Sequence, residues 1–151
     1  MELSRVTTEP RTVLAVRERV PFAELTDFFG RAFERAAAAL GEAKSFPSGP
    51  PVAVYYGDPT DTVDVAAGFP FVGSITPPDG TTLVELPGGP AVEAIHVGPY
   101  DELEKTYTTV AEWMQQEHVT PSSVMWEEYL AGPDSDPDPS TWRTRIVYPI
   151  A

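Results

Sequence analysis

The chain has 151 residues, a formal net charge of −13 and no cysteine. This length is enough for a single domain that buries most of its apolar surface without a stabilising metal ion or disulfide. The missing cysteines exclude a disulfide framework and a thiolate nucleophile, and the negative charge repels polyanions, so we expect no direct nucleic-acid binding.

The N-terminal sequence has no basic start followed by an apolar segment, and no stretch is long enough to span a bilayer. We therefore expect a cytoplasmic protein with no membrane partner, and the absence of cysteine fits a reducing compartment. With only two histidines the chain predicts no metal site, and we expect no cofactor. A protein partner is left open.

The first half of the sequence predicts a strand, a helix and two further strands. A short apolar run covers residues 13–19, and residues 52–56 and about 62–72 read as strands. We expect the last of these to be broken at Gly68 and Pro70, because proline cannot donate a hydrogen bond to a central ladder. The helix should begin at Pro21 and end at Gly41, since apolar residues recur there at helical spacing: Phe22, Leu25, Phe29, Phe33, Ala36 and Leu40.

After a linker at residues 73–80, rich in proline and glycine, the same pattern begins again. Strands are predicted at residues 91–97, 123–130 and 142–150. A second amphipathic helix is predicted between the first two of them, ending near His118, on the spacing of Pro99, Tyr100, Leu103, Tyr107, Val110 and Met114.

The two halves align with each other, which indicates an internal duplication. An offset of 78 places Pro21 to Leu25 on Pro99 to Leu103, and further along Tyr55 matches Tyr129. We therefore predict an α+β fold: a tandem strand-helix-strand-strand repeat whose strands join one antiparallel sheet with both main helices on one face. The expected domain covers residues 1–151, with repeats at about 1–73 and about 81–151.

The stretch 123–130 is the most unusual part of the chain, because it places Glu127 and Glu128 inside an otherwise apolar strand. Successive side chains of a strand point to opposite faces, so one of the two acids faces apolar surroundings, but this alternation does not decide which. The first half has Ala53 and Val54 at the matching positions. This difference favours a task specific to the second half, and the alternative is an edge strand with both acids in water.

Three segments together resemble the GyrI-like small-molecule-binding domain. They run from His96 to Leu103 (HVGPYDEL), from Trp126 to Leu130 (WEEYL) and from Arg143 to Ile150 (RTRIVYPI). This family is the effector-binding fold of BmrR-type multidrug-sensing regulators and of the stand-alone gyrase-inhibitory protein. The resemblance covers residues from about 12 to 151, and implies two modules related by a pseudo-two-fold with a ligand cleft between them.

In that family an acidic residue two places before a tyrosine pairs with flat cationic ligands, and the matching residues here are Glu127 and Tyr129. The sequence departs from the family in two ways. Many relatives read Thr-Glu-Ile in the closing strand, where this chain has Thr144, Arg145 and Ile146. No helix-turn-helix segment is attached, so DNA-linked regulation within this chain is not expected.

The resemblance implies a stand-alone binding protein for hydrophobic, aromatic or cationic small molecules. The alternative is a hydrolase of cyclopropane-bearing DNA-alkylating natural products, with Glu127 as general acid or base and Tyr129 or Trp126 positioning the substrate. A weaker alternative is a gyrase-inhibitory protein. The residues expected to bind the ligand are Glu127, Tyr129, Trp126, Met125, Tyr55, Phe69, Phe71 and Tyr148.

Overall fold

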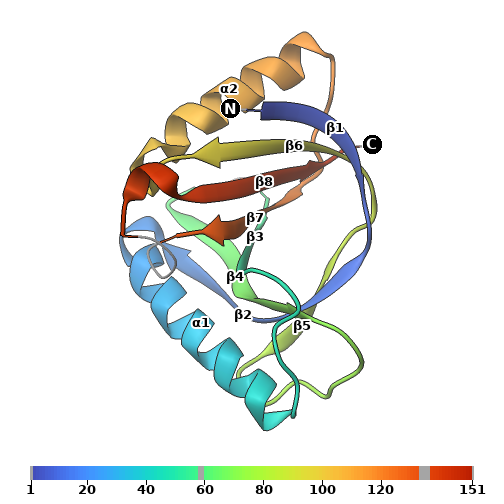
Figure 1. Cartoon of the computed structure of the whole chain (residues 1–151), viewed down its shortest axis with the longest axis vertical. Coiled ribbons are helices and arrows are strands. Elements are labelled where there is room, and N and C mark those ends of the chain that lie inside the picture. Colours follow the sequence, from blue (N-terminus) through green and yellow to red (C-terminus); the bar gives the residue numbers. More distant parts are fainter. Residues whose placement is uncertain (1, 58–59, 133–136, 151) are drawn as a thin grey trace.

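Eight strands pair into one antiparallel sheet in the order β1-β6-β8-β7-β3-β4-β2-β5. The structure is a computed structural model that describes residues 2–57, 60–132 and 137–150. Figure 1 shows that the sheet curls, with both long helices along one side of it. The strands are β1 (Glu2–Thr8), β2 (Arg11–Pro21), β3 (Val52–Tyr56), β4 (Thr62–Phe71), β5 (Thr82–Leu86), β6 (Gly89–Val97), β7 (Val124–Ala131) and β8 (Arg143–Pro149).

Both long helices begin in the same way, with a proline at or near the end of a strand followed by a short helix that leads into the long one. Pro21 precedes the short helix η1 (Phe22–Glu24), which continues into α1 (Leu25–Glu42). Pro99 precedes η2 (Tyr100–Glu102), which continues into α2 (Leu103–Gln116). The fixed φ of proline and its missing N–H suit the first helical turn. A third short helix, η3 (Pro139–Thr141), precedes β8.

The order of the strands displays the duplication. When β1 to β4 are exchanged for β5 to β8, the strand order reads the same from the opposite end of the sheet. The pseudo-two-fold axis therefore lies between β3 and β7, which pair at the centre, and the predicted α+β repeat is confirmed. Ala53 pairs with Glu127 in this ladder. The alignment of Tyr55 with Tyr129 makes these same two residues equivalent, so the axis passes through this pair.

Strands β1 and β5 were not predicted from the sequence, and each pairs with the other half of the chain. β1 lies beside β6, with Val6 opposite Ala91, and β5 lies beside β2, with Val84 opposite Val13. The offset of 78 relates these two pairs to each other. The repeat is therefore one strand longer than predicted, and the two halves exchange their first strands.

The expected break in β4 does not occur, because β4 pairs with β2 as far as Phe71. The carbonyl of Pro70 accepts a hydrogen bond from the Ser48 N–H at 2.8 Å. The nitrogen of Pro70 points to the same edge of β4 as this carbonyl, and β3 pairs with that edge only as far as Gly68. No ladder bond is lost there. Gly68 permits the close approach of β2, since a Cβ at this position would lie 1.9 Å from the carbonyl oxygen of Leu14.

The two faces of the sheet carry separate apolar clusters. On one face α1 covers residues such as Val65 and α2 covers residues such as Ile146. The opposite face is packed around Trp126, Val54 and neighbouring aliphatic side chains of the curled sheet. In the part of the chain that the structure describes, no helix is long and apolar enough to cross a membrane.

Candidate functional site

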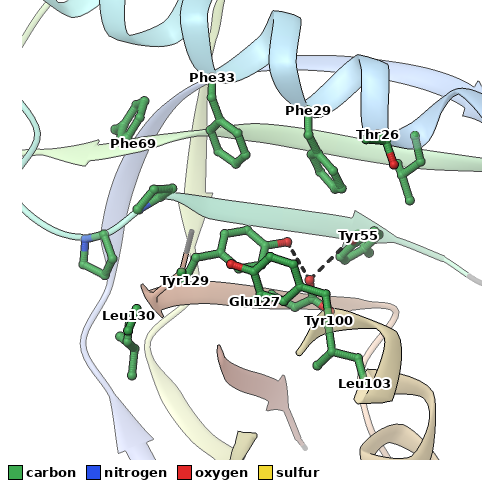
Figure 2. A pocket seen from close by; sticks show the side chains of 15 residues that line it. Thr26, Phe29, Phe33, Tyr55, Phe69, Tyr100, Leu103, Glu127, Tyr129 and Leu130 are labelled. Atoms are coloured by element: carbon green, nitrogen blue, oxygen red, sulfur yellow. Dashed lines mark hydrogen bonds between the residues drawn. The ribbon is translucent and has the colours of Figure 1, made fainter. Parts of the chain in front are cut away.

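A cleft of about 770 Å³ lies on the helix-bearing face of the sheet, over β3 and β7. Side chains of α1 form one wall, and residues of η2 and α2 reach it from the other side (Figure 2). The cleft is lined by Leu25, Thr26, Phe29, Phe33, Pro50, Pro51, Tyr55, Phe69, Tyr100, Leu103, Glu127, Tyr129, Leu130, Ala131 and Gly132.

Glu127 lies at the floor of this cleft and is only 4% exposed. Its Oε1 accepts hydrogen bonds from the hydroxyls of Tyr129 at 2.6 Å and Tyr55 at 3.5 Å, and its Oε2 accepts one from the hydroxyl of Tyr107 in α2. None of the ion pairs among the described residues includes Glu127. Its charge is therefore held by three neutral phenols.

Burial raises the pKa of the Glu127 carboxyl above its usual value, because the charged form loses its water. The three tyrosine hydroxyls oppose this rise in pKa by stabilising the anion. Burial and then the charge of Glu127 raise the pKa of Tyr107, Tyr129 and Tyr55, so these phenols stay protonated and act as donors. The same two causes raise the pKa of Tyr148 to about 12.

Aromatic rings form a continuous wall around the carboxylate. The rings of Phe29 and Phe33 stack with centroids 5.9 Å apart, and Phe33 meets the ring edges of Phe69 at 5.8 Å and Tyr129 at 6.2 Å. Tyr100 contacts Tyr129 from the α2 side at 5.8 Å. Aromatic faces of this kind attract cations, so the cleft combines one negative charge with several rings.

The two walls of the cleft differ in their hydroxyl groups. Phe29 in α1 and Tyr107 in α2 occupy equivalent positions, at the offset of 78. Only the α2 member of the pair carries a hydroxyl, and this hydroxyl binds Glu127. The α1 wall is therefore mainly hydrocarbon, with Thr26 as its one hydroxyl-bearing lining residue, and the hydroxyls that bind Glu127 come from β3, β7 and α2.

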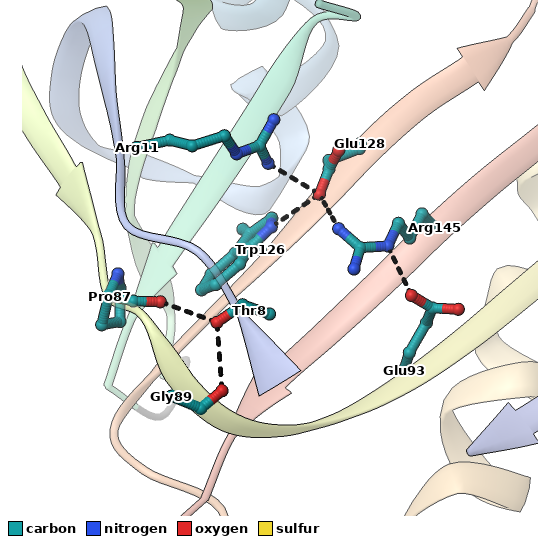
Figure 3. Close-up of polar contacts among 8 residues, drawn as sticks. All are labelled: Thr8, Arg11, Pro87, Gly89, Glu93, Trp126, Glu128 and Arg145. Carbon is teal, nitrogen blue, oxygen red and sulfur yellow. Dashed lines mark hydrogen bonds and ion pairs between the residues drawn. The ribbon is translucent and has the colours of Figure 1, made fainter. Parts of the chain in front are cut away.

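Glu128 lies on the opposite face of the sheet, so Glu127 is the acid that faces the cleft. Oε2 of Glu128 accepts a hydrogen bond from Trp126 Nε1 at 3.0 Å and pairs with Arg11 at 2.9 Å and Arg145 at 2.5 Å. Arg145 also binds Glu93 at 2.7 Å (Figure 3). The negative charges of Glu128 and Glu93 and the positive charges of Arg11 and Arg145 therefore balance within this group. Arg145, which stands where many relatives carry an acid, thus points away from the cleft.

Four of the expected ligand-binding residues line the cleft, namely Glu127, Tyr129, Tyr55 and Phe69. The other four do not. Trp126 is on the opposite face because it alternates with Glu127 along β7, and it is buried against Val54 and its neighbours. This placement also removes Trp126 as a residue that positions a substrate.

Phe71, Met125 and Tyr148 share the helix-bearing face with Glu127 but lie outside the cleft lining. Phe71 packs under the end of α1 with Leu40. Met125 and Tyr148 pack under α2, where the ring of Tyr148 meets the edge of Tyr107 at a centroid distance of 6.4 Å. The helices cover these three positions, whereas the centre of the sheet stays open between them.

Sequence reasoning missed the helical contribution to the site: Phe29, Phe33, Tyr100, Leu103 and Tyr107. All five belong to the apolar stripes of the two predicted helices, and such stripes usually face a core. One signal was present in the sequence. Tyr107 stands opposite Phe29 in the duplication, a polar and apolar difference like that between Glu127 and Ala53.

His96, near the end of β6, packs between the sheet and the start of α2. It is 4% exposed, and its Nδ1 lies 2.6 Å from Thr106 Oγ1. Its Nε2 lies 3.0 Å from the carbonyl oxygen of Pro99, which can only accept, so Nε2 carries a proton. Most of the acidic run at residues 134–138 lies outside the described residues. Within the described part no group of three or more His, Asp or Glu could hold a metal ion.

Comparison with known proteins extends the likeness to the whole chain. The family model of the GyrI-like small molecule binding domain matches residues 1–151. No curated protein matches the sequence.

Several solved structures share the fold at low identity. The crystal structure of the EcmrR C-terminal domain has a TM-score of 0.82 and 19% identity, covering 99% of this chain and 97% of that one. SAV2435 bound to tetraphenylphosphonium has a TM-score of 0.73 and 13% identity, over 100% and 94% of the two chains. A hydrolase encoded by lin2189 from Listeria innocua has a TM-score of 0.64 and 14% identity, over 99% and 92%.

Proposed function

This chain belongs to the GyrI-like small-molecule-binding domain family, and from that premise we propose that it binds hydrophobic cations. Glu127 is the counter-charge and the surrounding rings are the walls. The observation that carries this proposal is a buried carboxylate that forms no ion pair among the described residues, at the floor of an aromatic cleft.

A buried carboxylate is costly unless a cation or several donors compensate it. The chain shows both solutions on neighbouring residues. Glu128 is compensated by Arg11 and Arg145, whereas Glu127 has only phenols and opens to a cleft of about 770 Å³. A ligand cation would supply the missing positive charge, and each ring contact would add about 0.5–2 kcal/mol.

The relatives support the same chemistry. SAV2435, which shares this fold, has been solved with tetraphenylphosphonium, a hydrophobic cation whose phosphorus carries four phenyl groups. A cleft of about 770 Å³ is within the usual range for sites that enclose a drug-sized molecule. The dominance of rings and aliphatic groups in its lining suits such a ligand better than a strongly hydrated one.

Titration calorimetry with tetraphenylphosphonium tests the proposal. Glu127→Gln should weaken binding by on the order of tenfold or more, because it removes the counter-charge while keeping the size of the side chain. Glu104→Gln, at an exposed position of α2, makes the same change in net charge and should bind like the unaltered protein. Neutral triphenylphosphine oxide should bind weakly and lose nothing on Glu127→Gln. Equal affinity of Glu127→Gln and the unaltered protein for the cation would refute the proposal.

A hydrolase is the second candidate, favoured by the raised pKa of Glu127 and by the shared fold of a Listeria innocua hydrolase. Glu127 would take a proton from a water molecule whose oxygen bonds to a carbon of a strained cyclopropane. The carbon–carbon bond then breaks, its electron pair stays with the released carbon, and Glu127 returns the proton to that carbon, so that one water molecule is added in total. Tyr129, bonded to Oε1, would orient the carboxylate.

Counting turnovers separates this candidate from simple binding. A hydrolase should convert many equivalents of a cyclopropane-bearing alkylator per protein molecule, and Glu127→Gln should stop the reaction. A trace that ends at one equivalent means that the protein is only alkylated or binds the compound, and rules out this candidate.

A further inference from the structure

The carboxylate of Glu127 has most of its hydrogen-bonding capacity already in use. A carboxylate offers about four lone-pair positions. Tyr129 and Tyr55 donate to Oε1, and Tyr107 donates to Oε2, so three hydroxyls occupy positions before any ligand arrives. A ligand can reach the negative charge, but it finds about one position at which to donate a hydrogen bond.

Apart from the phenols that already bind Glu127, the lining side chains offer two further hydroxyl acceptors, those of Thr26 and Tyr100. The side chains of Leu25, Phe29, Phe33, Phe69 and Leu103 present only carbon to the cleft. A primary ammonium group carries three N–H donors, and each loses a water molecule when the ion enters such a site. An N–H that finds no acceptor there keeps the full cost of losing its water.

We propose that the cleft selects cations that carry no N–H donor, such as quaternary ammonium and phosphonium ions, over protonated amines with the same carbon skeleton. This inference rests on the proposed function and adds the chemical class of its ligand. Such ions keep the attraction to Glu127 and to the rings, and they have no donor to leave unpaired. Methyl groups in place of N–H also add apolar surface for the cleft to bury.

Tyr107 is the residue that sets this selectivity most directly. It is the only one of the three donors to Glu127 that comes from a helix, and its hydroxyl occupies Oε2. Phenylalanine already stands at the equivalent place in α1, as Phe29. Tyr107→Phe would free an acceptor position on Oε2 with little change in shape, so a protonated amine should gain affinity relative to a quaternary ion.

The experiment is a series of ligands in which only N-methylation changes: 4-phenylbenzylamine, its N,N-dimethyl derivative and its N,N,N-trimethylammonium derivative. Affinities are measured by calorimetry near neutral pH, where all three are cations. We expect affinity to rise along the series, with the trimethylammonium ion favoured over the primary amine by on the order of tenfold or more. In Tyr107→Phe this ratio should fall several-fold.

Tyr148→Phe is the matched control, because Tyr148 lies beside Tyr107 but donates no hydrogen bond to Glu127. It should keep the ratio of the unaltered protein, and thermal melting confirms that each variant is folded. If the primary amine binds as tightly as the trimethylammonium ion, the inference is wrong and the proposed function stands. If neither this series nor tetraphenylphosphonium binds, the proposed function itself fails.

Discussion

Glu127 and Glu128 are adjacent in the sequence, yet the fold treats them in opposite ways. Each is 4% exposed. Glu128 is bound by two guanidinium groups and an indole N–H on one face of the sheet, and Glu127 by three phenols on the other. Residue type and burial are therefore the same, and the donors around each carboxylate decide its chemistry. A compensated acid serves stability, and the other remains available to a ligand.

The pKa of Glu127 predicts a dependence of stability on pH. Burial raises this pKa above 4.5 in the folded protein, so between the two values the folded state holds a proton that the unfolded chain has released. The free energy of unfolding should therefore be greatest below the unfolded pKa and fall as pH rises through this interval, by up to about 1.4 kcal/mol per pH unit. Glu127→Gln removes the effect.

Urea denaturation at a series of pH values measures this directly. The stability of Glu127→Gln relative to the unaltered protein should rise with pH across the interval and then level off. Glu104→Gln, whose carboxyl is exposed, serves as the control and should follow the unaltered protein. Parallel profiles for Glu127→Gln and the unaltered protein would show that folding does not perturb this carboxyl.

Comparison of the two halves of the sequence led to the prediction that Glu127 is a site residue. Glu127 stood out because Ala53 occupies its place in the first half. The alternation of β7 could not separate Glu127 from Glu128, since both faces of the sheet are covered. Which face carries a cleft depends on the spacing of α1 and α2, and this spacing is a property of the packed structure. For the same reason the sequence could not show that Trp126 lies on the face opposite the cleft.

At the scale of elements, α1 and α2 begin alike but pack differently. α1 buries Phe28 together with small residues, Ala32, Ala36 and Ala39, against the sheet. α2 buries Thr106, Val110 and Met114, and its half-buried Tyr107 reaches Glu127. Small residues allow a helix to lie close to its sheet, whereas the larger side chains of α2 fill the space towards the cleft. Apart from Thr26, the α1 side of the cleft is hydrocarbon, whereas α2 contributes a hydroxyl that binds Glu127.

The space around two glycines predicts opposite effects of substitution on stability, because Gly68 lies where β2 approaches β4 closely and Gly30 lies on an open side of α1. Gly68→Ala should lower the free energy of unfolding by more than about 3 kcal/mol, because its Cβ would overlap the backbone of Leu14. Gly30→Ala, in α1 with open space around it, should raise the free energy of unfolding by about 0.5–1 kcal/mol. Chemical denaturation measures both changes. A mild loss for Gly68→Ala would mean that β2 can move away without cost.

The sequence predicted both helices and six of the strands, but β1 and β5 went unnoticed. Alternation between apolar and polar residues is short there, as in β5, where only Val84, Glu85 and Leu86 alternate, and this signal is weak beside a helical stripe. Their pairing is also non-local, since each completes the opposite half. The apparent obstacle at Pro70 was misread because the sequence does not show which side of a strand lacks a neighbour.

At the scale of the whole molecule, the pseudo-two-fold axis explains why a single acid is enough. The axis passes through the pair of Ala53 and Glu127. Two residues at the axis are neighbours across the ladder, with Cβ atoms about 4.5–5.5 Å apart. A symmetric duplication would place two carboxylates side by side there, and two buried carboxylates at such a distance share one proton.

Ala53→Glu tests this reasoning. The variant should be less stable than Ala53→Gln by several kcal/mol near neutral pH, because two like charges meet in a buried site. The gap should close as the pH falls and one carboxyl becomes protonated. Ala53→Gln controls for the added volume at a position that is 0% exposed. Equal stability of the two variants at neutral pH would place position 53 away from Glu127.

The position of that lone charge on the axis also governs how a guest can be oriented. A half-turn about the axis exchanges the two walls and leaves the anion at the same depth. Under the proposed function, a ligand with its charge at its centre would meet the same carboxylate whichever end enters first. Two poses of similar energy would make binding tolerant of ligand shape, so the two-fold architecture would favour a broad range of ligands over a single one.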